Sequence, residues 1–357
     1  MSRSPMTVSG RIREGVRTLD PGYFALVMAT GIISIGMLAH GMTAVSVVLL
    51  WLAGIAHVVL TLATIARIIA FPTEFRADVA DPRRGFAMFT FVAATDVVGV
   101  RLNDDGHTTA ACVLLAIGVV AWLVLGYLVP GLVVAGRRYR SALRKVDGTW
   151  FVWAVASQSV AALAAVVAPE LHTGGQEMAL LAVFCWSVGI FQYLVTAILV
   201  AARMLIHPPG VNDLTPPYWI AMGATAITVL AGAHIARLAE SPVTTVAGGL
   251  IAGASLAFWS FGTWLIPPLI AAGIWRHLVR RVPLTYTPAL WSMVFPLGMY
   301  AAAGRELGEA DGLSLITRIG DCGSWIALAV WTVTFAGMVV ALTRALLELP
   351  AHPSRRP

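Results

Sequence analysis

Long, uninterrupted apolar runs recur along the whole chain and limit it to one kind of fold. About 20 residues, rising 1.5 Å each, cross the ~30 Å hydrocarbon core of a membrane as a helix. Ten such runs can be counted, at roughly 21–39, 44–70, 86–102, 109–136, 149–168, 177–206, 217–238, 245–275, 288–304 and 321–347. Charged residues make up 12% of the chain, whereas about a quarter is typical of soluble domains. The sequence therefore predicts an all-α integral membrane protein.

The ten spans leave no stretch long enough for a separate soluble domain. We expect a basic cytoplasmic tail at 1–19, a ten-helix transmembrane domain at 20–347 and a second cytoplasmic tail at 348–357. The first stretch is polar and lacks a small-residue cleavage site before the first span, which favours a retained tail over a signal peptide. The expected location is the plasma membrane, with the chain crossing it many times.

The distribution of positive charge predicts the orientation of the helices. Cytoplasmic loops carry an excess of Lys and Arg. With the N-terminus inside, 20 of the 24 basic residues are cytoplasmic, and four lie outside: Arg101, Arg237, Arg305 and Arg318. Both termini are then cytoplasmic, and the basic surplus requires no nucleic-acid partner.

The sequence contains no motif of enzyme or metal chemistry. There is no HExxH, no P-loop and no GxGxxG after a strand, and the three cysteines have no metal or redox spacing. His57, His234 and Asp96 are the only candidates for chemistry at membrane depth, and no spacing links them. We expect no catalytic residue, metal or cofactor, so a membrane-embedded enzyme is a remote alternative. A purely structural scaffold is also remote, because several spans carry polar residues and no soluble domain is left.

A repeat relates the five odd-numbered spans, which are shorter and richer in small and hydroxyl residues than the even-numbered ones. They align on one anchor position: Thr30, Thr95, Ser157, Thr225 and Leu297. Six residues before each anchor stands an aromatic residue: Phe24, Phe89, Phe151, Trp219 and Trp291. Anchor spacings of 65, 62, 68 and 72 residues make each unit one helical hairpin. The repeat predicts five hairpins around a central pore, with the small-residue helices inside.

The anchor layer supplies the expected lining of this pore. Thr30, Thr95, Ser157 and Thr225 offer hydroxyls, and Gly298 follows the fifth anchor. Hydroxyl groups can hydrogen-bond an anion or water without fixing it tightly, which permits passage. The alternative is that each hydroxyl bonds back to its own helix.

The fifth repeat differs from the others two residues before its anchor, where Phe295 is followed by Pro296. The other repeats have smaller or flexible residues there: Met28, Ala93, Val155 and Gly223. A proline kink is tolerated in a membrane helix and could aim the preceding ring at the pore axis. Phe295 would then form a hydrophobic constriction that closes the pore by dewetting. The alternative is that it packs between helices.

Few ionisable residues lie near the expected pore. Asp96 is the only acid that we expect in the interior of a span, which makes it a candidate proton or anion site. The alternative is a hydrogen-bonded structural carboxyl at a helix interface. Arg101, Arg237 and Arg305 lie at the outer ends of odd-numbered spans, where they could concentrate anions in a vestibule unless nearby acids pair with them.

Three segments resemble a known family: GYFALVMATGIIS at 22–34, SFGTWLIPPL at 260–269 and PALWSMVFPLGMYAAA at 288–303. They are similar to the tellurite-resistance/dicarboxylate transporter family, which includes plant slow anion channels, fungal malate and sulfite transporters and bacterial tellurite-resistance membrane proteins. The likeness runs from about residue 20 to 347. It implies five hairpins, a homotrimer with one pore per subunit, and a pore-occluding phenylalanine in the ninth helix, here Phe295.

The resemblance implies transport of small anions, either C4-dicarboxylates such as malate or chloride and nitrate. An alternative is efflux of an oxyanion such as sulfite or tellurite. A channel and a proton-coupled transporter both remain open. The expected partners are these anions, membrane lipid and further copies of the chain, with no nucleic acid.

Overall fold

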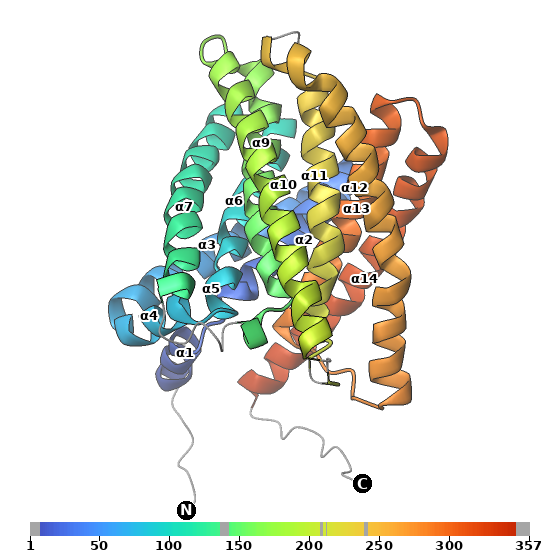
Figure 1. Cartoon of the computed structure of the whole chain (residues 1–357). Helices are drawn as coiled ribbons and strands as arrows, with labels where there is room; N and C mark the ends of the chain where they lie inside the picture. Colours follow the sequence, from blue (N-terminus) through green and yellow to red (C-terminus); the bar gives the residue numbers. More distant parts are fainter. Residues whose placement is uncertain (1–7, 136–142, 208–209, 212, 239–241, 348–357) are drawn as a thin grey trace, which may run out of the picture.

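The computed structural model describes residues 8–135, 143–207, 210–211, 213–238 and 242–347, and within these ranges it contains helices and no strand (Figure 1). A short helix, α1 (Val8–Arg17), precedes the bundle. Two more, α4 (Pro72–Ala80) and α5 (Arg84–Ala87), connect the second and third expected spans. The tail expected at 348–357 lies outside the described residues.

Five helices, here called the inner helices, correspond to the odd-numbered spans. They are α2 (Ala25–Ala39), α6 (Phe89–Asp104), α9 (Val152–Val167), α11 (Ile220–Ala236) and α13 (Trp291–Ala310). Four of them follow a 3-10 turn: η1 (Pro21–Phe24), η2 (Gly148–Phe151), η4 (Pro216–Trp219) and η6 (Pro288–Leu290). A further 3-10 turn, η3 (Ala168–Glu170), ends α9.

The remaining five long helices are here called the outer helices. They are α3 (Thr43–Ala70), α7 (Thr108–Ala135), α10 (Gly175–Ile206), α12 (Pro242–Ile274) and α14 (Ser314–Leu346). A single π-helical turn, η5 (Trp275–Val279), extends α12. Helix α1 and the last turns of α14 lie at the same end of the bundle (Figure 1).

Helix starts follow a local signal ten residues before four of the five anchors. Asp20 and Asp147 cap the first turns, accepting hydrogen bonds from the backbone N–H groups of Gly22 (2.8 Å) and Thr149 (2.9 Å). Thr215 and Thr287 occupy the matching positions, and each is followed by a proline at the first helical position. Proline suits that position because its missing N–H would have no helical partner there.

Nine helices of the described ranges are long and apolar enough to cross a membrane, and they coincide with nine of the ten expected spans. The expected span 288–304 corresponds to η6 and α13, which is not among the nine. Its last turns carry Arg305, Glu306 and Glu309. These charges reduce the apolar character of α13, although its first half is apolar.

Helix packing separates the inner from the outer set. The inner helices contact one another in the closed order α2, α6, α9, α11, α13 and back to α2. Each outer helix packs on the inner helix that precedes it and touches the next inner helix, and α14 closes the circle onto α2. The apolar windows of the outer helices are only 17–39% buried, against 61–89% for those of the four inner helices among the nine. The exposed apolar sides of the outer helices therefore suit contact with lipid.

Small residues permit the close packing of the inner helices. A Cβ added at Gly31 of α2 would lie 2.7 Å from Val97 of α6, and one at Gly99 of α6 would lie 2.6 Å from Leu163 of α9. These glycines allow the helices to approach at distances that a side chain would prevent. The same device recurs around α13.

Candidate functional site

Helix α13 carries the expected gate residue, and its neighbours define which way each face points. Pro296 packs on Gly223 of α11, where an added Cβ would lie 2.9 Å from the proline ring. On another face, a Cβ at Gly298 would lie 2.8 Å from Ile32 of α2. Gly304 packs on α14. The helix is therefore held on three sides, by α11, α2 and α14.

Phe295 projects from the fourth side of α13. It lies about two and a half helical turns from Gly304, so its side chain leaves the helix opposite the α14 face. That direction, between α11 and α2, is the interior of the ring of inner helices. The side chain is only 1% exposed. Proline at 296 lacks the N–H that would bond the carbonyl of Ser292, which loosens the helix beside the ring.

The anchor hydroxyls are buried, and their contacts are with outer helices or with their own helix. Thr30 accepts a hydrogen bond from Trp331 Nε1 of α14 (3.0 Å), and Ser157 accepts one from Trp122 Nε1 of α7 (2.7 Å). Thr95 donates to its own helix at the Phe91 carbonyl (2.8 Å).

The remaining contacts of the anchor hydroxyls also involve outer helices or the residue's own helix. Thr95 Oγ1 also lies 3.5 Å from His57 of α3. Thr225 donates to the Met222 carbonyl (2.7 Å) and packs on Gly262 of α12. These contacts point away from the ring interior and argue against the expected lining role of the four hydroxyls. A hydroxyl in a membrane helix needs a partner, and the backbone and the indole N–H groups supply it here.

Asp96 lies between helices and has no cationic partner among the described residues. Ser159 of α9 donates a hydrogen bond to its Oδ2 (2.7 Å). Its Oδ1 is fully enclosed and packs on Gly118 of α7, where an added Cβ would lie only 2.2 Å away. Asp96 is therefore packed in the wall between α6, α7 and α9. This geometry favours the structural alternative over a site in the path of an anion.

A cavity of about 460 Å³ opens at the C-terminal ends of the inner helices. Residues of all five inner helices line it, among them the following: Ile35, Asp104, Val166, His234, Arg237 and Arg305. We call this cavity the vestibule.

The vestibule arginines are paired with carboxylates. Arg237 forms an ion pair with Glu306, which also lines the cavity. Arg305 pairs with Asp321 (2.7 Å) and Glu309 (2.9 Å). Paired cations in a cavity that also holds carboxylates give little excess positive potential. The vestibule therefore attracts anions less than its arginines alone would.

Arg101 does not line the vestibule. Its side chain is fully buried, and its Nε donates to the hydroxyls of Ser34 of α2 (3.2 Å) and Ser46 of α3 (3.0 Å). Its Nη1 pairs with Asp105 one turn later (2.7 Å). Arg101 therefore joins α2, α3 and α6 near the vestibule end of the bundle.

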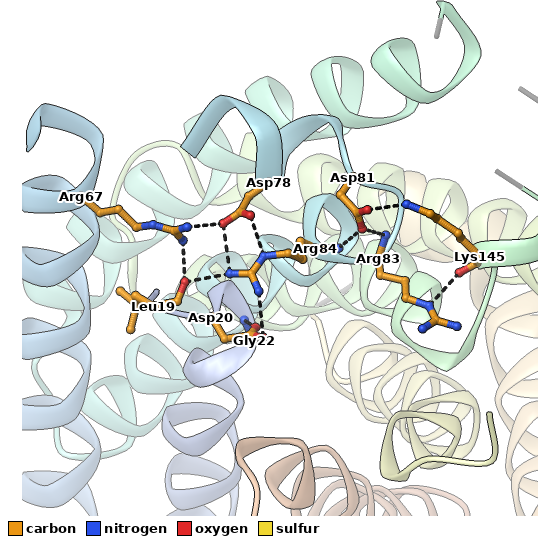
Figure 2. A network of polar contacts seen from close by, with 9 residues as sticks. All are labelled: Leu19, Asp20, Gly22, Arg67, Asp78, Asp81, Arg83, Arg84 and Lys145. Carbon is orange, nitrogen blue, oxygen red and sulfur yellow. Dashed lines mark hydrogen bonds and ion pairs between the residues drawn. The ribbon is translucent and has the colours of Figure 1, made fainter. Parts of the chain in front are cut away.

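A polar network at the opposite end of the bundle was not expected from the sequence (Figure 2). Asp78 of α4 receives Arg67 Nη2 at 2.6 Å and Arg84 Nε at 2.7 Å. Both arginines also donate to the Leu19 carbonyl, at 2.5 and 3.0 Å. The network therefore ties α3, α4 and α5 to the segment that enters α2.

A second carboxylate anchors the next connection. Asp81 accepts hydrogen bonds from the backbone N–H of Arg83 (2.9 Å) and Arg84 (3.2 Å) and pairs with Lys145 (2.7 Å). Burial pushes the pKa of Asp81 upward, but the hydrogen bonds from Lys145 and the backbone outweigh it and hold the pKa below its usual value. At Asp147, burial is stronger than the attraction of Arg83, so its pKa is raised.

The candidates for enzyme or metal chemistry, His57 and His234, have different surroundings. His57 packs between the rings of Phe24 and Phe91, whereas His234 lines the vestibule. Among the described residues, no three His, Cys, Asp or Glu side chains are grouped as metal ligands would be. The three cysteines are free thiols, of which one is buried, one half-buried and one exposed.

Comparison with known proteins gives matches along nearly the whole chain. A family model described as voltage-dependent anion channel matches residues 18–339. An uncharacterized membrane protein of Mycobacterium tuberculosis is 57% identical over 150 residues, which are 42% of this chain and 76% of that protein. An uncharacterized transporter of Methanocaldococcus jannaschii is 24% identical over 330 residues, covering 89% of this chain and 92% of that protein. A sulfite efflux pump of Arthroderma otae is 22% identical over 355 residues, covering 90% of each.

These matches confirm the resemblance to the tellurite-resistance/dicarboxylate transporter family. The family model spans all five inner helices and nearly all of the fifth outer helix. The chain therefore belongs to the voltage-dependent anion channel family.

Proposed function

We propose that this protein carries small anions across the plasma membrane through a pore enclosed by the five inner helices and closed by Phe295. The ten long helices act as five hairpins that all cross the membrane, with both termini cytoplasmic. Transport, not catalysis, is the activity, and it requires no cofactor. We further propose that the chain works as a homotrimer with one pore in each subunit.

The gate rests on the position of Phe295 on α13. Helix geometry places its Cβ between the faces that pack on α11 and α2, and opposite the face that packs on α14. A phenyl ring in a narrow channel excludes water, and an anion cannot pass a dry constriction without losing its hydration. Pro296 supports this role because it packs on Gly223 while leaving the carbonyl of Ser292 without its helical partner.

The electrostatics of the vestibule bear on the substrate. Arg237 and Arg305 are each paired with carboxylates, so the mouth offers an anion weak attraction. A dianion such as malate gains most from a strongly positive mouth. We therefore rank small monovalent anions, chloride and nitrate, above C4-dicarboxylates.

Efflux of an oxyanion is the second candidate function. It is favoured by the likeness to proteins named sulfite efflux pumps, one of which covers 90% of this chain. Sulfite is a small oxyanion that could use the same pore, and tellurite belongs to the same chemical class. The two functions differ in substrate and direction and not in the proposed path.

An anion-flux assay tests the function. The protein is reconstituted in liposomes as wild type, Phe295→Ala and Phe191→Ala, since Phe191 is a 71% exposed ring on the outer helix α10. Chloride, nitrate, malate and sulfite are supplied in turn. We expect Phe295→Ala to carry a small anion much faster than wild type and Phe191→Ala to match wild type. Equal flux through all three, with folded protein in each case, would contradict the proposal.

A further inference from the structure

A large apolar groove of about 780 Å³ lies between α10 and α12, outside the ring of inner helices. Its walls are mostly large apolar side chains, with small residues among them: Ala197 and Ala201 on α10, and Ala272 and Gly273 on α12. A Cβ added at Gly273 would meet no atom within 4 Å. The groove is therefore a space that these two helices leave unfilled.

The groove is longer than the hydrocarbon part of one membrane leaflet. Its lining on and beyond α12 extends from Phe261 to Leu278, which is about 26 Å of helix at 1.5 Å per residue. Half of a ~30 Å hydrocarbon core is about 15 Å. The C-terminal end of α12, which η5 extends, lies at the end of the bundle that also holds α1 (Figure 1). An acyl chain can therefore lie in the groove with its headgroup at that end.

Positive charge gathers where the groove ends. Arg276 and His277 line it, and Arg280 and Arg281 follow directly. Arg276 is occupied, because its Nη1 donates to the carbonyls of Val211 (2.5 Å) and Leu214 (3.0 Å).

Two of these cations remain available for a ligand. Arg280 lies over the ring of Trp275, 5.0 Å from its centre, and both Arg280 and Arg281 are exposed. Within the described part of the chain, neither has a carboxylate partner. Basic pockets between membrane helices on the cytoplasmic side bind the headgroups of anionic lipids.

We propose that this groove binds an anionic phospholipid, with an acyl chain between α10 and α12 and the phosphate at Arg280 and Arg281. The apolar walls would hold the acyl chain, and the two arginines would make the groove prefer an anionic headgroup. The groove also touches Leu290 and Met293, at the start of the helix that carries Phe295. The site requires insertion into a membrane but not anion transport, so either conclusion can fail without the other.

Native mass spectrometry of the full chain tests this site. The protein is inserted in nanodiscs of equal phosphatidylcholine and phosphatidylglycerol, released, and the retained lipids are counted. We expect the wild-type protein to retain phosphatidylglycerol in preference to phosphatidylcholine. The double variant Arg280→Gln, Arg281→Asn should lose roughly thirtyfold of that preference, because each cation near a headgroup contributes about a factor of five or more. Asn suits position 281, where φ is 53°.

Matched variants separate the groove from general lipid contact. Ala272→Phe fills the groove and should abolish retention, whereas Ala116→Phe on α7 places the same ring on an exposed face. Arg76→Gln removes an exposed cation from α4 and should change nothing.

Three results would overturn the proposal. The first is equal retention of both lipids by wild type. The second is unchanged retention in Ala272→Phe. The third is loss of oligomers in Ala272→Phe without loss of lipid, which would make the groove a contact between subunits. If Ala272→Phe fails to fold, the double arginine variant decides alone.

Discussion

Removing the carboxylate of Asp78 should destabilise the protein more than removing any exposed acid. Asp78 pairs with Arg67 Nη2 at 2.6 Å, and with Arg84 through its Nε at 2.7 Å and its Nη2 at 3.1 Å. The Arg67 side chain is only 5% exposed. Asp78→Ala would therefore leave a buried guanidinium without its counter-charge. Breaking a buried pair in this way costs about 3–5 kcal/mol.

The structure sets the expected value at the lower end of that range. Arg67 keeps its hydrogen bond to the Leu19 carbonyl, and Arg84 is 34% exposed, so water can solvate it. We expect Asp78→Ala to lower the free energy of unfolding by about 3 kcal/mol. Glu14→Gln breaks the exposed pair with Arg17 and should have no measurable effect.

Unfolding in detergent, followed by circular dichroism at increasing denaturant, measures the difference between the two variants. Replacing Arg67, Asp78 and Arg84 together by Met, Leu and Met should recover much of the loss, since no buried charge then lacks a partner. If Asp78→Ala is as stable as Glu14→Gln, the network does not hold α3, α4 and α5 together as described.

Two further predictions concern pH and packing. Because the pKa of Asp81 is held below its usual value, its pair with Lys145 stabilises the fold above the unfolded pKa near 3.9, and the contribution is lost as pH falls through the folded pKa. Asp81→Asn should therefore reduce the denaturation midpoint more at pH 7 than at about pH 2.5; equal effects at both would refute the linkage. Gly118→Ala should destabilise by about 1–3 kcal/mol, because the new Cβ would meet Asp96 at 2.2 Å. Gly126→Ala, on the same helix, adds a Cβ that would meet no atom within 4 Å and should be neutral or stabilising. A thermal-shift assay on both glycine variants measures the difference.

The positions of the helices could be predicted from the sequence because the bilayer imposes one length on every span. Nine expected spans match helices long and apolar enough to cross it. The repeat was also informative: equivalent anchors have equivalent surroundings, each packed toward an outer helix. A repeat reveals that five helices share a rotational phase, but it does not say which side of the helix faces inward. The pore-lining role of the Thr30 and Ser157 hydroxyls therefore stays a prediction, beside their contacts with outer helices.

The side-chain partners of residues far apart in the chain could not be predicted from the sequence. Arg101 and Arg237 both end inner helices, yet one is fully buried against Ser34 and Ser46 and the other lines the vestibule. Which neighbours each side chain meets depends on packing. The missed caps had a usable signal, since Asp20 and Asp147 both stand ten residues before an anchor.

The size of the side chain at position 295 tests the central claim most directly. Single-channel conductance in planar bilayers would be measured for Phe295→Gly, Phe295→Ala, Phe295→Leu and wild type, all in the same chloride gradient. A ring that closes the path predicts that conductance falls steadily as the side chain grows, with reversal at the chloride potential throughout. Conductance that does not depend on residue 295, in variants that remain folded, would contradict a pore closed by Phe295.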